Sequence, residues 1–245
     1  MTSTARASLP DTLFGGALKL HQPARGEGYR VNVDAVVLAW VAAEPGRSAR
    51  TIDLGAGVGA VGLSLLYRDA TSHVVLVEKD RALSELSASN LAANGWGARG
   101  LVRCADVGDA DAFEPASAGL VVCNPPYVPP GRGRAPLVAK GARMGELAVF
   151  AQAARRALGR RGRACFIYPA GELATLLETL RAAGLEPKRL CFVHPFVDEP
   201  ARVALVSAMP AKRGGLVLQP PLVERSGETL SHAMQAILAA RPDAT

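Results

Sequence analysis

A glycine-rich stretch near residue 55 has the spacing of a nucleotide-binding loop. Asp53-Leu-Gly55-Ala-Gly57-Val-Gly59 follows a short β-branched run and precedes a segment with helical spacing. Glycines at such a turn let the backbone approach a ligand, and the helix N-terminus offers free N–H donors. Glu78 ends the next apolar run, about twenty residues after Gly57, where a ribose diol needs a carboxylate. The spacing therefore predicts a site for an adenosine.

Two cofactors bring an adenosine to such a site, and the loop alone does not separate them. Gly57-Val-Gly59-Ala-Val-Gly62 also matches the G-x-G-x-x-G pattern of NAD-binding proteins. Asp53 favours S-adenosylmethionine, because a carboxylate accepts hydrogen bonds from an amino-acid ammonium but repels a pyrophosphate. Asp106, just after a third apolar run, is expected to read an adenine amino group. The alternatives are that Asp53 caps the following turn and that Asp106 forms an Asx-turn.

A second motif, Asn124-Pro125-Pro126-Tyr127, ends a fourth apolar run. Pro125 restricts the residue before it to extended geometry. The side-chain oxygen of Asn124 and the carbonyl of Pro125 are then two acceptors that can take both hydrogens of a conjugated amine. Tyr127 supplies a face for a planar base, a stacking contact worth ~1–3 kcal/mol. A proline-rich strand terminator is the alternative, but it leaves the flanking Asn and Tyr unexplained.

Such a pair of acceptors predicts methyl transfer to an amino group. When both hydrogens are held, the nitrogen lone pair is directed at a sulfonium methyl for in-line attack, a reaction driven mainly by positioning. No strong general base is needed, because the product ammonium is acidic.

These loops require a parallel sheet that brings them to one edge. Helical spacing predicts helices over residues 34–43, 58–69, 80–95 and 146–158, another after Pro169, and a weak one over 229–240; Asn32 and Asp80 are expected N-caps. The predicted strands are near 50–55, 73–79, 101–104, 119–124, 163–169, 190–194 and 202–208. No helix separates the last two strands, so they are expected to be antiparallel. The prediction is an α/β fold: a doubly wound, seven-stranded, mostly parallel Rossmann-like sheet with one antiparallel edge strand.

Composition excludes several classes of protein. With 245 residues, 49% hydrophobic and 20% charged, the chain is predicted to fold as one or at most two domains and is not intrinsically disordered. Its four cysteines are far apart and read as small buried residues of a reducing compartment, and no metal-ligand spacing occurs. No apolar run approaches the ~20 residues of a bilayer span, and the N-terminus lacks a signal-peptide core. We expect a cytoplasmic protein without metal or membrane contact; these patterns leave the oligomeric state open.

The formal net charge of +6 suits an anionic partner. Four cations directly follow the NPPY motif, at Arg132, Arg134, Lys140 and Arg143. Their positions suit phosphate contacts that would guide an RNA loop to the base site. A solvated basic loop is the equal alternative.

The pair DLGAGVG and NPPY resembles the class I S-adenosylmethionine-dependent amino-methyltransferases. Within them, the chain resembles the bacterial tRNA1(Val) (adenine-37-N6)-methyltransferase family over nearly its whole length. The narrower resemblance is carried by Gly28-Tyr29-Arg30-Val-Asn-Val-Asp34, Asn124-PPY-Val-Pro-Pro-Gly131, Glu186-PKRLCFVHP-Phe196, Arg202-VALV-Ser207 and Gln219-PPLV-Glu224. It implies methylation of the N6 amine of an anticodon-loop adenine in a tRNA1(Val)-like substrate.

The resemblance also implies roles for individual residues. Asn124, Pro125 and Tyr127 would hold the base. Cofactor contacts are implied for Tyr29, Arg30, Asp34, Asp53, Gly55, Ala56, Gly57, Glu78, Lys79, Asp106, Val107 and Asn124. Residues 1–30 are expected to pack near the cofactor site, 31–210 to form the methyltransferase domain, and the basic tail 211–245 to belong to that domain. One departure is visible: the family often shows Ala-Arg-His-Glu where this chain has Ala142-Arg143-Met144-Gly145-Glu146, which affects substrate contacts more than the chemistry.

Three other functions fit part of the pattern. Amino-methylation of rRNA or DNA bases uses the same motif. Methylation of a release-factor glutamine amide does too, although those enzymes usually carry a helical domain before the glycine loop, and only some fifty residues precede it here. An NAD-dependent oxidoreductase would fit the glycines but would not explain Asn124 to Tyr127.

Overall fold

A computed structural model describes residues 11–23, 31–43, 48–125 and 137–239. The main strands of the sheet are β3 (Ser48–Leu54), β4 (Thr71–Glu78), β5 (Gly100–Cys104), β6 (Ala118–Cys123), β7 (Leu158–Pro169), β8 (Glu186–His194) and β9 (Val203–Met209). The helices are α1 (Val33–Ala42), α2 (Ala60–Tyr67), α3 (Arg81–Ala93), α4 (Leu137–Ala157), α5 (Leu173–Ala182) and α6 (His232–Leu238). Each predicted strand and helix is present, and α4 begins nine residues earlier than expected.

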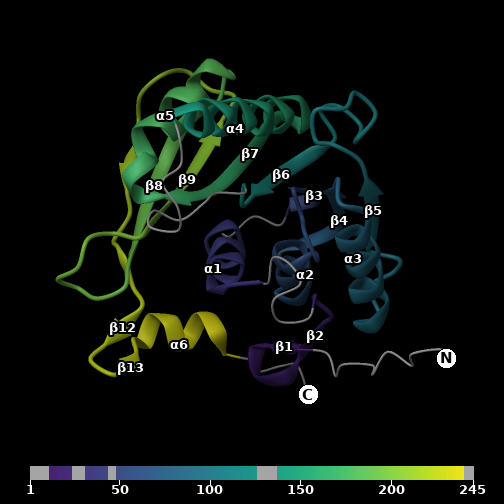
Figure 1. The fold of residues 1–245 in the computed structure, drawn as a ribbon, viewed down its shortest axis with the longest axis horizontal. Helices are drawn as coiled ribbons and strands as arrows, with labels where there is room; N and C mark the ends of the chain where they lie inside the picture. Colours follow the sequence, from purple (N-terminus) through teal and green to yellow (C-terminus); the bar gives the residue numbers. More distant parts are fainter. Residues whose placement is uncertain (1–10, 24–30, 44–47, 126–136, 240–245) are drawn as a thin grey trace.

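The strands form one sheet in the order β10-β8-β9-β7-β6-β3-β4-β5, where β10 is Val217–Leu218 and a further strand, β11 (Leu222–Val223), also pairs with β8 (Figure 1). The α/β fold class is confirmed, and the last two long strands are antiparallel to each other as predicted. The described sheet has nine strands and not the predicted seven, because the two-residue strands β10 and β11 also pair with β8. The reversed strand, however, is not at the edge: β9 lies between β7 and β8 and pairs antiparallel with both. Val203 to Val206 are buried, so both faces of β9 are covered, and both of its hydrogen-bonding edges are paired.

Helices cover both faces of the sheet. Alternate strand residues point to opposite faces, so Val74 and Leu76 join one apolar cluster while Val75 and Val77 join the other. The first cluster contains α1, α2, α6 and Leu91 of α3, and the second contains α4 and α5 (Figure 1). None of the helices in the described ranges has the length and apolarity that a bilayer span requires.

The third glycine of the G-x-G-x-x-G match packs α2 against the sheet. A Cβ atom on Gly62 would lie 2.5 Å from Cδ2 of Leu76 and 2.8 Å from Cγ2 of Val74. Both neighbours are buried in β4. This glycine therefore permits close contact between helix and strand, whichever cofactor the loop binds.

The N-terminal region contains structure that the sequence pattern did not reveal. β1 (Asp11–Leu13) pairs antiparallel with β2 (Leu18–Leu20), with the short 3-10 helix η1 (Phe14–Gly16) between them. Phe14 stacks on Tyr67 at 4.6 Å between ring centroids. Each of these strands has only three residues, too few to show an alternating apolar pattern, so the sequence did not predict the hairpin.

The remaining short elements are a 3-10 turn, η2 (Ala170–Glu172), and a small hairpin of β12 (Arg225–Ser226) with β13 (Thr229–Leu230). Beyond that hairpin, α6 buries Met234 and Ile237 in the same cluster as α1. Three cysteines are buried as expected, but the prediction was wrong for Cys104, which is exposed at the end of the edge strand β5.

Candidate active site

A cavity of about 570 Å³ opens where β3, β4 and β6 end. Carboxyl ends of parallel strands are the usual ligand site of a doubly wound sheet, and this volume is typical of a small-molecule pocket. The lining residues are Val31, Asn32, Ala35, Asp53, Gly55, Ala56, Gly57, Val58, Ala60, Val61, Glu78, Lys79, Leu83, Ala105, Asp106, Val107, Asn124, Pro125, Glu146, Val149 and Phe150.

The glycine loop turns sharply between β3 and α2. The backbone N–H groups of Gly55 and Ala56 both donate to the carbonyl of Val77, at 2.9 and 3.0 Å. Gly57 has φ +56°, a left-handed conformation that costs glycine little. The loop is thereby bent over the end of β4, with its backbone exposed to the cavity.

Glu78 holds this loop in place. Its Oε2 accepts from the N–H of Gly57 at 2.9 Å, and its Oε1 accepts from the N–H of Asp80 at 2.8 Å. Each carboxylate oxygen has more than one lone pair, so the group can also accept from a ligand hydroxyl in the cavity that it lines. The geometry is therefore compatible with the predicted ribose contact.

Two residues of α3 that sequence reasoning missed support the same loop. Ser87 donates from Oγ to the carbonyl of Gly57 at 2.7 Å. The fully buried Asn90 donates from Nδ2 to the carbonyls of Val58 and His21, both at 2.9 Å, and accepts from the N–H of His21. Asn90 therefore ties the segment after β2 to the cofactor-side loop.

Asp53 lines the cavity and is also buried within the protein. Its Oδ2 accepts from the N–H of Gly62 at 2.9 Å, so the capping alternative is present in the structure alongside the cavity position. Burial raises the pKa of Asp53 to about 7; the bond from Gly62 lowers it and the nearby Glu78 carboxylate raises it. A cation in the cavity would favour the ionised form, so its binding near neutral pH is coupled to proton release.

The raised pKa predicts a pH-dependent stability that Asp53→Asn removes. Because the folded protein binds this proton more tightly than the unfolded chain, protonated Asp53 contributes fully to the free energy of unfolding below about pH 4, and this contribution is lost as the pH rises to about 7. Between these pH values we expect the free energy of unfolding of the Asp53→Asn variant to rise by about 4 kcal/mol relative to that of the wild type. Urea unfolding of both proteins at several pH values measures this difference, and parallel stability curves would refute it.

Asp106 and Lys79 line the cavity just beyond the ends of β5 and β4. Oδ1 of Asp106 accepts from the N–H of Gly108 at 2.9 Å, which is the Asx-turn alternative, while Oδ2 lies 3.9 Å from Nζ of Lys79. Asp106 is half-exposed, and its neighbour Val107 is buried. Both Asp106 and Val107 line the cavity, so local turn formation and a ligand contact are compatible.

Asn124 and Pro125 form the part of the cavity wall that follows β6. Leu54 and Cys123 are direct partners in the parallel ladder of β3 and β6, so Asn124 and Gly55 emerge side by side. Tyr127, Tyr29, Arg30, Arg132 and Arg134 lie outside the described residues. Lys140 and Arg143 lie in the first part of α4, and their side chains are outside the described set.

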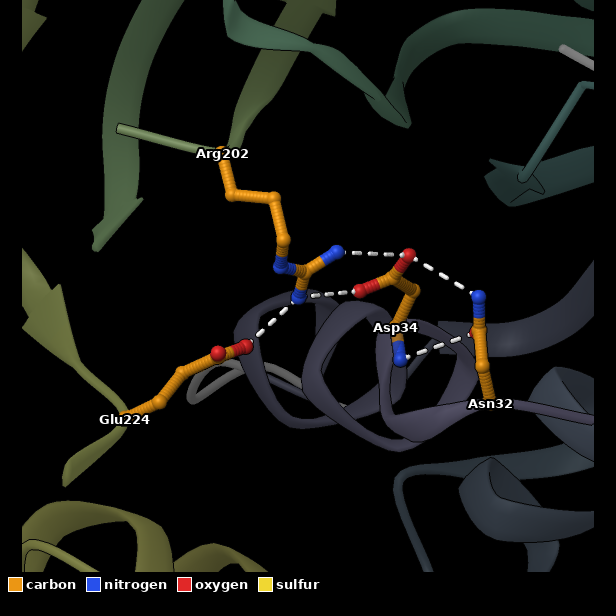
Figure 2. A network of polar contacts seen from close by, with 4 residues as sticks. All are labelled: Asn32, Asp34, Arg202 and Glu224. Carbon is orange, nitrogen blue, oxygen red and sulfur yellow. Dashed lines mark hydrogen bonds and ion pairs between the residues drawn. The ribbon is translucent and has the colours of Figure 1, made fainter. Parts of the chain in front are cut away.

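Asp34 is the predicted residue that the structure does not bring to the cavity. It lies in the first turn of α1, is 1% exposed, and binds the guanidinium of Arg202 with both oxygens (Figure 2). Its neighbour Asn32, predicted only as the helix cap, does cap α1 and also lines the cavity. Asp34 is only two positions from the lining residue Asn32, so the sequence alone could not show that its carboxylate points away from the cavity.

The structure adds two walls that sequence reasoning did not assign. α1 contributes Ala35 beside Val31 and Asn32, and α4 contributes Val149 and Phe150. An acidic residue, Glu146, lies on the same side of α4. The apolar period of α4 was visible in the sequence, but it could not tell residues of the core from residues of a pocket.

The charges of the cavity favour a cationic ligand. Among the described lining residues, four are acids (Asp53, Glu78, Asp106 and Glu146) and one is basic (Lys79), although the chain as a whole has a net charge of +6. A pyrophosphate would be repelled here, whereas a ligand with an ammonium, a sulfonium and ribose hydroxyls matches the acceptors. The residues present therefore fit S-adenosylmethionine. No group of three or more metal-ligating side chains occurs in the described part of the chain.

Comparison with known proteins agrees with this geometry. A family model described as "Methyltransferase small domain" matches residues 32–164. A tRNA1(Val) (adenine(37)-N6)-methyltransferase of Pectobacterium carotovorum is 36% identical over 105 residues, 42% of this chain and 41% of that protein. One of the same name from Bacteroides fragilis is 35% identical over 100 residues, 40% of this chain and 41% of that protein. The matched region thus spans about two-fifths of the length of these relatives.

Solved structures with a similar fold include one described as a methyltransferase. A predicted O-methyltransferase from Agrobacterium tumefaciens superposes with a TM-score of 0.64 at 24% identity, over 84% of this chain and 97% of that one. TrmN from Thermus thermophilus gives a TM-score of 0.55 at 16% identity, over 71% of this chain and 47% of that one. At these identities the likeness concerns the fold.

Proposed function

Because the chain belongs to the Methyltransferase small domain family and is an S-adenosylmethionine-dependent methyltransferase, we propose that it methylates the exocyclic N6 amine of an adenine in tRNA. The observation that carries the proposal is the position of Asn124 and Pro125 on the wall of the cavity, beside the glycine loop. The proposed target is an adenine of the anticodon loop in a tRNA1(Val)-like substrate, as the names of the curated relatives suggest.

The residues of this chain act mainly by binding and orientation. When bound, S-adenosylmethionine supplies an activated methyl group on its sulfonium. Glu78 accepts from the ribose hydroxyls and Asp53 from the ammonium, which fixes the direction of the methyl group. Asn124 and the carbonyl of Pro125 accept both hydrogens of the target amine, so its lone pair points along the transfer axis. Tyr127 stacks on the base after the base has flipped out of the anticodon loop. The loop is single-stranded, so the free-energy cost of unstacking the base is low.

The substrate and setting are part of the same proposal. Arg132, Arg134, Lys140 and Arg143 contact RNA phosphates near the base site, and the enzyme acts in the cytoplasm. Residues 31–210 form the catalytic domain, residues 1–30 pack near the cofactor site, and the tail 211–245 belongs to that domain. The burial of Met234 and Ile237 against α1, and the contacts of Asn90 with His21, support this division.

Nucleoside mass spectrometry on total tRNA from a strain that lacks the gene, beside its parent, tests the substrate. We expect N6-methyladenosine to disappear from one anticodon loop and to return when the gene is restored. Unchanged tRNA overturns the tRNA proposal. In that case, transfer of labelled methyl groups by the purified enzyme to rRNA, DNA or a release-factor glutamine would identify which alternative substrate replaces it.

A further inference from the structure

Arg202 occupies a junction between the C-terminal strands and the wall of the cofactor cavity. We infer that Arg202 is a positioning residue, which holds the first turn of α1 against the cavity through Asp34 and so sets cofactor affinity. The inference rests on the methyltransferase function of the cavity, but it does not depend on the identity of the methylated substrate.

The topology brings Arg202 to the correct edge of the sheet. β9 is antiparallel to its neighbours, so it begins where the parallel strands end. Arg202 immediately precedes β9, and its backbone is fixed on both sides: its N–H donates to the carbonyl of Val193 at 2.8 Å, and its carbonyl accepts from the N–H of Ala170 at 3.1 Å. The side chain therefore extends from a rigid position toward α1 (Figure 2).

The guanidinium binds Asp34 through two parallel hydrogen bonds. Nη1 donates to Oδ2 at 3.1 Å, and Nη2 donates to Oδ1 at 2.6 Å. Nη2 also donates to Oε1 of Glu224 at 2.5 Å, so one cation links two carboxylates. Burial lowers the pKa of Arg202, but the bonds to Asp34 and Glu224 more than offset this and raise it above its ordinary value. The cation is therefore a permanent part of the junction.

The contact reaches the cavity through the helix cap. Nδ2 of Asn32 donates to Oδ2 of Asp34, and the N–H of Asp34 donates to Oδ1 of Asn32, both at 3.1 Å. Asn32, Val31 and Ala35 line the cavity, whereas neither Asp34 nor Arg202 is a lining residue. Arg202 therefore acts on the ligand through the backbone and cap of α1.

Glu224 extends the junction to the C-terminal segment. Its N–H donates to the carbonyl of His194 at 2.8 Å, and its own carbonyl accepts from the N–H of Ser231 at 2.9 Å. The second carboxylate restricts the guanidinium to the orientation that meets Asp34 with a fork of two bonds, a geometry that lysine cannot reproduce.

A matched control pair lies at the other end of the strands, where the parallel strands begin. Arg181 binds the buried Glu186 with two hydrogen bonds, at 3.2 and 3.1 Å. Glu186 is the first residue of β8, so this pair lies away from the carboxyl ends of the parallel strands. Both pairs combine a partly exposed arginine with a buried acid, but only one of them adjoins the cavity.

The test compares Arg202→Met with Arg181→Met by urea unfolding and by titration with S-adenosylhomocysteine. We expect both variants to lose stability, whereas only Arg202→Met lowers the affinity for S-adenosylhomocysteine, by about tenfold. With saturating cofactor, kcat should stay within about threefold of the wild type while KM for S-adenosylmethionine rises with the dissociation constant. Arg202→Lys should restore part of the affinity.

Equal affinities in the two methionine variants would overturn the inference, as would an unchanged affinity in Arg202→Met. If Arg202→Met alone does not fold, the double variant Arg202→Met with Asp34→Asn removes the unpaired buried charge and should still show the tenfold loss. Because the titration contains no nucleic acid, a failed tRNA assay leaves this result intact.

Discussion

Replacement of Asn124 by alanine is expected to lower methyl transfer to tRNA on the order of 10²–10³-fold, the usual effect of removing one preorganised polar group from a reaction centre. Asn124 follows the central strand β6 and lines the cavity next to the glycine loop. The alanine variant keeps the cavity and its acids but loses one of the two acceptors for the target amine. The measurement is the single-turnover rate with labelled S-adenosylmethionine and the tRNA substrate.

Two comparisons make this prediction specific. Asn124→Asp keeps an acceptor oxygen at the same place, so it should retain more activity than alanine. We assign Asn124 to the substrate amine and not to the cofactor contact that the resemblance also implies, so the dissociation constant for S-adenosylhomocysteine should change less than about threefold in either variant. A rate for Asn124→Ala within tenfold of the wild type would refute the assigned role. An equally large loss of cofactor affinity would instead make Asn124 a cofactor residue.

The parts of the site that follow strands could be predicted because their signals are local. Glycines after β3, an acid at the end of β4 and Asn-Pro after β6 each adjoin an apolar run, and parallel strands bring their carboxyl ends together. The structure collects Asp53, Glu78 and Asn124 around one cavity accordingly. The caps Asn32 and Asp80 were predictable for the same reason, since each accepts from a backbone N–H within three residues.

The remaining parts depend on contacts between distant residues. Arg202 and Asp34 are 168 positions apart, and no local pattern indicates that they meet. The apolar face of α4 predicts a helix, but only the packed fold shows that Phe150, which packs against the core, and the exposed Val149 also line a pocket. Likewise, two strands joined by a loop are expected to be antiparallel, but this does not determine their order in the sheet. Only the packed fold shows that β9 pairs with β7 on one edge and with β8 on the other.

Glu78→Ala is expected to lower the affinity for S-adenosylhomocysteine about 100-fold. The substitution removes the acceptors that we assign to two ribose hydroxyls, and hydrogen bonds to a charged group contribute about 1.5–3 kcal/mol each. It also releases the N–H groups of Gly57 and Asp80, which Glu78 holds at 2.9 and 2.8 Å, so the glycine loop loses part of its support. Calorimetric titration measures the affinity, and Glu85→Ala, at an exposed residue of α3 paired with Arg81, is the control that should bind normally.

A smaller ligand separates the ribose contact from a general loss of the site. 5′-Methylthioadenosine keeps the adenine and ribose but lacks the amino-acid group that we assign to Asp53. Glu78→Ala should therefore weaken both ligands by a similar factor, whereas Asp53→Asn should weaken S-adenosylhomocysteine and leave methylthioadenosine nearly unchanged. If Glu78→Ala binds methylthioadenosine like the wild type, the ribose does not lie at the end of β4. The ribose contact assigned to Glu78 is then wrong, and its remaining effect on S-adenosylhomocysteine would come from the loss of support for the glycine loop.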